Sequence, residues 1–186
     1  MAAVTSTACV EVLIVAFGEL SDENWHEEVA KAERELRDRA ASFESTLDLN
    51  IEVAARNIGR GADWTVLALY FAIAAVIIPA AHRKIRENVV EWLRIYRELR
   101  AFLNWVVGER TALYPDEYLF LVAIEALSRE TAGQSIEYKG ALRLPEKNPD
   151  LQGREDLMFS FVDSGVLIQI AVSRHGQVLW RNTAQL

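Results

Sequence analysis

The sequence predicts an α+β protein built from three consecutive regions. Residues 1–60 are expected to form a strand–helix–strand unit, and residues 61–110 an apolar helix followed by a heptad helix. Residues 111–186 are expected to form a helix and an antiparallel β-meander that packs with the first region. Three observations carry this prediction: a β-branched apolar run near the amino terminus, a long uncharged run in the middle, and a heptad pattern directly after it.

Composition indicates an ordered protein without covalent or metal cross-links. The chain has 186 residues, about half of them apolar, a formal net charge of −7 and a single cysteine, Cys9. One cysteine excludes an intramolecular disulfide framework and any multi-cysteine metal site. The first residues lack a basic segment, and Glu11 interrupts their apolar part, so we expect no signal peptide. We therefore expect a cytoplasmic protein, with the inner membrane as its one alternative location.

The first region combines two strands and one amphipathic helix. Residues 10–17 are almost entirely apolar and β-branched, which predicts a strand buried on both faces. The alternating residues 47–53 predict a second, half-buried strand, and a parallel or an antiparallel neighbour remains open for it. Between the strands, a helix beginning near Ser21 has one apolar stripe, formed by Trp25, Val29, Ala32, Leu36, Ala40 and Phe43.

Residues 64–81 carry no charge and are expected to form an apolar helix. At a rise of about 1.5 Å, 18 residues extend roughly 27 Å, close to the bilayer core of about 30 Å. A basic cluster follows this run, as on the cytosolic side of a membrane span, and would suit an anionic lipid surface. The predicted membrane or interface residues are Trp64, Tyr70, Phe71, Arg83, Lys84 and Arg86.

The next stretch has the most regular pattern in the chain. Apolar residues recur at alternating spacings of four and three, which predicts a helix with a coiled-coil seam. Residues 82–110 contain seven bases and four acids, a smaller excess than a nucleic-acid-binding surface needs, so no nucleic acid is expected as a partner. The predicted oligomerisation residues are Ile85, Val89, Trp92, Tyr96, Leu99, Leu103 and Val106.

The last region begins with a helix and continues as strands. Pro115 followed by two acids predicts a helix start. One alternating strand is expected next, with its apolar residues at Ile136, Tyr138, Leu142 and Leu144. Three further strands with turns at 163–165 and 175–176 complete a meander.

No motif in the sequence indicates catalysis, a cofactor or a metal. Asp163, Ser164 and His175 are the residue types of a hydrolytic triad, but each lies in a predicted hairpin turn, which favours a structural role. The three histidines are far apart and form no metal-binding pattern. We expect that the protein is not an enzyme and binds no cofactor.

Two functions fit these observations. The first is a membrane-associated, self-assembling protein, such as a bacterial effector or a pore-like or anchor component, that inserts residues 64–81 and assembles through residues 85–107. The alternative is a soluble homo-oligomeric module that binds proteins and uses residues 64–81 as a buried core helix. A small-ligand sensor is a third option without residues of its own to support it.

Overall fold

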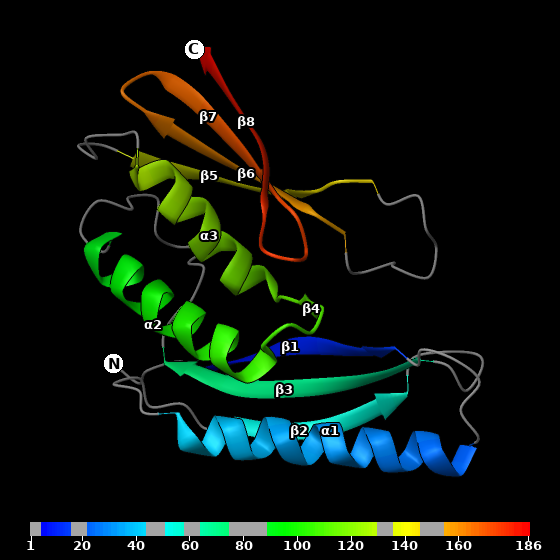
Figure 1. The fold of residues 1–186 in the computed structure, drawn as a ribbon. Helices are drawn as coiled ribbons and strands as arrows, with labels where there is room; N and C mark the ends of the chain where they lie inside the picture. Colours follow the sequence, from blue (N-terminus) through cyan, green and yellow to red (C-terminus); the bar gives the residue numbers. More distant parts are fainter. Residues whose placement is uncertain are drawn as a thin grey trace. The chain divides into compact units, whose positions relative to one another are not determined.

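The protein is a mixed α+β fold in a computed structural model that describes residues 5–15, 22–43, 51–57, 64–74, 89–129, 136–145 and 155–186. These residues form three helices and two antiparallel four-stranded sheets, which confirms the predicted α+β class (Figure 1). The chain divides into two compact units. One contains Met1–Ala75 and Glu98–Leu113, and the other contains Val76–Arg97 and Tyr114–Leu186.

The sheet of the first unit has the strand order β2-β3-β1-β4. Its strands are β1 (Thr5–Val15), β2 (Ile51–Asn57), β3 (Trp64–Ala74) and the short β4 (Ala112–Leu113). β1 and β3 are antiparallel and in register over eleven residues, from Thr5 opposite Ala74 to Val15 opposite Trp64. Val10 and Val12, which share one face of β1, are fully buried, whereas Cys9 and Glu11 of the other face are only partly buried. The predicted burial on both faces is therefore complete on one face only.

The prediction of a helix over residues 64–81 is wrong for residues 64–74, which form β3. The run over residues 64–74 is continuously apolar, and such a run has no period that distinguishes a strand from a buried helix. In the strand register, Tyr70 lies opposite Cys9 and Glu52, and Phe71 lies opposite Ala8 and Ile51. The rest of the predicted helix and the basic cluster Arg83, Lys84 and Arg86 lie outside the described residues. No described helix combines the length and the apolar character that a membrane span requires.

β3 also answers the open question about strand pairing. β1 and β2 are not neighbours, because β3 lies between them and pairs with both in antiparallel orientation. The helix that connects them in sequence, α1 (Asp22–Ser42), packs against β2. Its predicted stripe is confirmed: Trp25, Ala32, Leu36 and Ala40 are buried, and Val29 and Phe43 are partly buried.

The predicted heptad helix is observed as α2 (Val89–Val107). Val89 and Trp92 lie in it, whereas Ile85 lies outside the described residues. Four seam residues, Tyr96, Leu99, Leu103 and Val106, are buried within the single chain. In the first unit, α2 packs against the end of α1: the rings of Phe102 and Phe43 meet edge to face at 5.2 Å, and Trp105 Nε1 donates to the Arg39 carbonyl at 3.3 Å.

The second unit contains the predicted helix and meander. Helix α3 (Asp116–Ser128) follows Pro115 and covers one face of a sheet with the strand order β5-β6-β7-β8 (Figure 1). The strands are β5 (Ile136–Arg143), β6 (Leu157–Asp163), β7 (Val166–Val172) and β8 (Val178–Gln185). Phe120 of α3 packs its ring against Tyr138, Phe159 and Phe161, and these contacts define the inner face of the sheet.

A β-bulge in β5 changes the face on which its later residues lie. The pairing register with β6 shifts between Tyr138 and Gly140, so Lys139 is the extra residue. Strict alternation would put Leu142 on the inner face with Tyr138, and that prediction is wrong. The extra residue moves Leu142 to the outer face, where 58% of it is exposed. Gly140 has a φ of +134°, a conformation that suits glycine.

Candidate functional site

Exposed apolar side chains gather on the second sheet. Among the residues whose side-chain burial is described, six large apolar residues are exposed, and five of them lie in or next to strands β5 and β8. The sixth is Trp105 of the first unit, whose indole N–H already donates to α1 of the same unit. The five are Leu142, Val178, Leu179, Trp180 and Leu186. Contiguous exposed apolar surface is typical of an interaction site, whereas scattered exposed residues need no explanation.

The strand register places part of this set in one row on the outer face. Leu142 pairs with Met158, Met158 with Ala171, and Ala171 with Trp180, so the row crosses all four strands. Ala171 is fully buried within it, and the exposed members are Leu142 and Trp180 at the two ends. These residues alternate with Phe159 of the inner face, so their side chains point away from α3. Trp180 is 42% exposed and stands at the β8 end of the row.

β8 has a bulge at its beginning and a regular ladder after it. Its register with β7 shifts between Ala171 and Val172, which leaves Leu179 as the extra residue. From Trp180 onward, each residue has one partner on β7, and the backbone N–H of Leu186 donates to the Gly165 carbonyl at 3.0 Å. β8 is therefore a regular edge strand over its last six residues.

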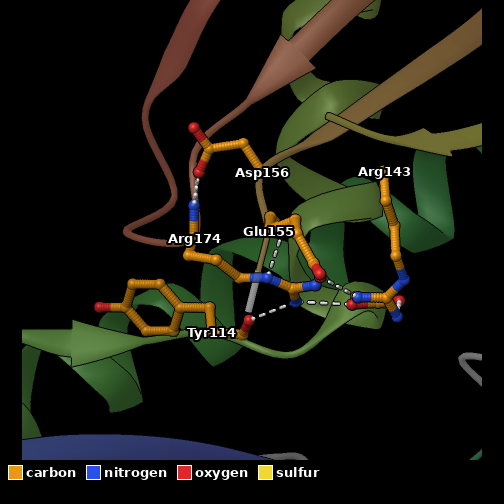
Figure 2. Close-up of polar contacts among 6 residues, drawn as sticks. Tyr114, Arg143, Glu155, Asp156 and Arg174 are labelled. Carbon is orange, nitrogen blue, oxygen red and sulfur yellow. Dashed lines mark hydrogen bonds and ion pairs between the residues drawn. The ribbon is translucent and has the colours of Figure 1, made fainter. Parts of the chain in front are cut away.

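A buried arginine holds the turn that leads into β8 (Figure 2). Arg174 follows β7, and its side chain is only 8% exposed. Its Nη1 contacts Asp116 Oδ1 at 2.6 Å and donates to the Tyr114 carbonyl at 3.2 Å, and its Nε donates to the Glu155 carbonyl at 2.7 Å. Its backbone N–H donates to Asp156 Oδ1 at 2.8 Å. One side chain thus connects the start of α3, the start of β6 and the end of β7.

A second arginine completes the network. Arg143 of β5 contacts Asp116 Oδ2 at 3.0 Å and Glu155 Oε2 at 3.2 Å, and its side chain is 51% exposed. Two guanidinium groups therefore face two carboxylates, and Asp156 adds a third. Although the buried Nη2 of Arg174 has no hydrogen-bond partner among the described residues, the network has no excess of positive charge. We interpret it as the support that fixes the β7–β8 turn.

The turn itself packs against two aromatic rings of the second unit. Gly176 has a φ of +74°, and a Cβ added there would lie 3.2 Å from ring atoms of Tyr114 and Tyr118. Those two rings contact each other, with centroids 4.4 Å apart. Packing and hydrogen bonds therefore fix the position at which β8 begins.

The inner face of the sheet holds a titratable group with a shifted pKa. Burial raises the pKa of the Tyr138 phenol, and the negative charge of Asp116 raises it further.

The structure separates the residues that resembled a triad. Asp163 and Ser164 lie in the β6–β7 turn, where Ser164 and Gly165 have φ values of 51° and 83°. His175 lies in the turn at the other end of β7. Seven residues at about 3.3 Å each put roughly 23 Å between these turns. Among the described residues, no group of three or more His, Cys, Asp or Glu side chains is placed to hold a metal ion.

Sequence reasoning identified β8 as a strand but missed its surface. The run Val178-Leu-Trp180 breaks the alternation of a half-buried strand, and this was the local signal for the bulge. Nothing in the local sequence signals Arg174, because its partners lie up to 60 residues away. Comparisons with protein-family models, with curated proteins and with solved structures find no match to this chain, so the argument for a function rests on this sheet.

Proposed function

We propose that this protein is a non-catalytic interaction module that associates with itself through the β5–β8 sheet. The observation that carries the proposal is the gathering of four exposed apolar residues, Val178, Leu179, Trp180 and Leu186, in and next to the edge strand β8. Exposed edge strands are a known route to strand pairing between chains, and natural proteins usually protect them. A homo-oligomeric module is the second of the two functions that the sequence suggests.

The heptad seam supports this proposal less well than the sheet does. Leu99, Leu103 and Val106 are fully buried in one chain. A side chain without exposed surface gains nothing from burial against a second chain, because the hydrophobic free energy follows the area removed from water. We therefore assign self-association to side chains that remain exposed.

Membrane insertion was predicted from a helix over residues 64–81, and residues 64–74 of that segment form β3 instead. β3 pairs on one side with β1 and on the other with β2, and this pairing uses its backbone along both edges. The membrane hypothesis required these residues to be helical. Contact of the basic cluster Arg83, Lys84 and Arg86 with an anionic lipid surface stays a prediction, since these residues lie outside the described part of the chain.

The energetic balance favours a modest affinity. Full burial of one large apolar side chain contributes about 1.5–3 kcal/mol, and each new backbone hydrogen bond adds a net of about 0.5–1.5 kcal/mol. Association costs roughly 4–15 kcal/mol in lost freedom of motion. The burial of Trp180 and Leu186 and the hydrogen bonds of an edge ladder together offset the cost of association with little free energy left over. We therefore expect a monomer–dimer equilibrium that shifts with protein concentration.

Sedimentation equilibrium of the full chain over micromolar to millimolar loading concentrations tests the proposal. We expect the average mass to rise from 21.0 kDa toward twice that value. Trp180→Lys should keep the mass at that of the monomer. Trp105→Lys is the matched control, because Trp105 is 54% exposed but belongs to the other unit. A wild-type chain that remains monomeric over the whole range would rule out the proposed self-association.

A further inference from the structure

We propose that two copies pair β8 with β8, antiparallel and edge to edge, around a two-fold axis that passes beside Thr183. The β5–β8 sheet of one copy and the β5–β8 sheet of the other would then form one continuous eight-stranded sheet. This inference rests on the proposed self-association and specifies which strand, which register and which residue pairs create it.

The two edges of the sheet differ in how well they are protected. β5 carries an ion pair between Lys139 and Glu137 at 2.8 Å, and its bulge at Lys139 interrupts regular pairing. Charged side chains and bulges are the usual protection of an edge strand. β8 carries one charged residue, Arg181, and its bulge at Leu179 lies at its beginning, so its ladder from Trp180 to Gln185 is regular. β8 is therefore the less protected of the two edges.

The hydrogen-bond pattern shows which backbone groups of β8 face outward. The bond from Leu186 N–H to the Gly165 carbonyl makes these two residues a hydrogen-bonded pair with β7. In an antiparallel ladder such pairs alternate, so Trp180, Asn182 and Ala184 also direct their backbone groups to β7. The residues between them direct their N–H and C=O groups to the outer edge. Thr183 lies in the middle of this outward-facing set.

Symmetry then restricts the register. A two-fold axis perpendicular to the sheet keeps the two outer faces on the same side, so each residue must pair with one whose side chain shares its face. With the axis beside Thr183, Thr183 pairs with its own copy, and Trp180 lies opposite Leu186 of the second copy. With the axis beside Arg181, two arginines would lie directly opposite each other, which is destabilising.

The Thr183 register is also the one that uses the exposed apolar residues. It pairs Trp180, 42% exposed, with Leu186, 76% exposed, on both sides of the axis. It places Arg181 opposite the neutral Gln185. An axis beside Asn182 would put Ala184 opposite Trp180 and would move Leu186 to the bulged start of β8, away from Trp180. In the Thr183 register, the outer-face row that ends at Trp180 continues onto Leu186 of the second copy.

A charge-swap experiment at Thr183 tests the register. Thr183 is exposed and pairs only with its own copy across the proposed axis, so Thr183→Lys and Thr183→Glu each create a like-charge pair there. We expect each variant alone to raise the dimer dissociation constant about fivefold, the upper range for a cross-strand pair. An equimolar mixture of the two variants should restore the wild-type constant or improve it, because opposite charges then face each other.

Leu142→Lys is the matched control. Leu142 shares the outer-face row but lies on β5, at the far edge of the sheet, so edge pairing through β8 predicts an unchanged dissociation constant. A loss of dimer in Leu142→Lys, with no change in either Thr183 variant, would overturn the inference in favour of face-to-face stacking. A wild-type dimer with no recovery in the mixed Thr183 variants would overturn the register while the proposed self-association stands. A monomeric wild type would refute both.

Discussion

Asp116 should contribute far more to stability through Arg174 than through Arg143, although it contacts both. The test is Asp116→Asn, which removes the charge and keeps the shape of the side chain. Arg174 is 8% exposed and Arg143 is 51% exposed, so the same carboxylate forms one nearly buried pair and one solvated pair.

The expected magnitudes follow from these exposures. Breaking a fully buried ion pair costs about 3–5 kcal/mol, because the remaining charge is left without compensation. Asp116 itself is 38% exposed, so water can solvate part of the site, and we expect about 2–3 kcal/mol for Asp116→Asn. Arg143→Gln removes a pair exposed to solvent and should cost about 0–1 kcal/mol. A double-mutant cycle between Asp116→Asn and Arg174→Met should give a coupling of about 1.5–3 kcal/mol.

Native-state amide exchange in β6 and β7 measures the opening of this unit separately from the other one. A loss of 2–3 kcal/mol corresponds to exchange that is about 30- to 150-fold faster wherever global opening of the unit limits it. The control cycle pairs Asp116→Asn with Arg143→Gln and should give a coupling below about 0.5 kcal/mol. Equal couplings in the two cycles would refute the claim that burial of Arg174 makes this network a support of the β7–β8 turn.

Three further predictions concern the same unit. Phe120→Ala removes a buried ring that contacts three others, and it should cost about 3–5 kcal/mol in urea unfolding. Gly176→Ala should lower the thermal midpoint more than Gly165→Ala does. Both positions have positive φ, but only a Cβ at Gly176 meets ring atoms, at 3.2 Å, and equal shifts would contradict this reasoning. The pKa of Tyr138 is raised above its ordinary value near 10, so the folded state holds this proton more tightly than the unfolded state. The resulting stability is fully present below pH 10 and is lost as pH rises toward the folded pKa. Tyr138→Phe should flatten the alkaline part of the stability profile, and an unchanged slope would show that Tyr138 does not cause it.

The elements that the sequence predicts correctly are those with a clear period. The stripe of α1 and the seam of α2 repeat every three to four residues, and both helices form. The buried members of the two patterns are Trp25, Ala32, Leu36 and Ala40 in α1 and Tyr96, Leu99, Leu103 and Val106 in α2. The meander β6–β8 is marked by short apolar runs and by glycine turns at Gly165 and Gly176, whose positive φ values the turns require. In each case, a local pattern contains the information that the structure uses.

The failures have a common physical cause. β3 and a buried helix have the same composition, and only the partners of the segment decide between them. β1, an apolar strand that needs neighbours on both edges, was the available signal that a further strand was missing from the first region. The face on which Leu142 lies depends on a single extra residue in β5, and an isolated glycine at Gly140 was the only local sign of it.

The candidate surface was beyond local sequence reasoning for a different reason. Apolar periodicity reports which side chains will be buried, but it does not report which molecule buries them. The heptad residues Leu99 and Leu103 are buried in their own chain, so the strongest periodic signal is already accounted for without a partner. What remains exposed is Trp180, in a strand whose three-residue start, Val-Leu-Trp, looks like any core strand. Only the strand order, with β8 at an edge, shows that this strand lacks a described neighbour on one side, and that position is why we expect a second copy there.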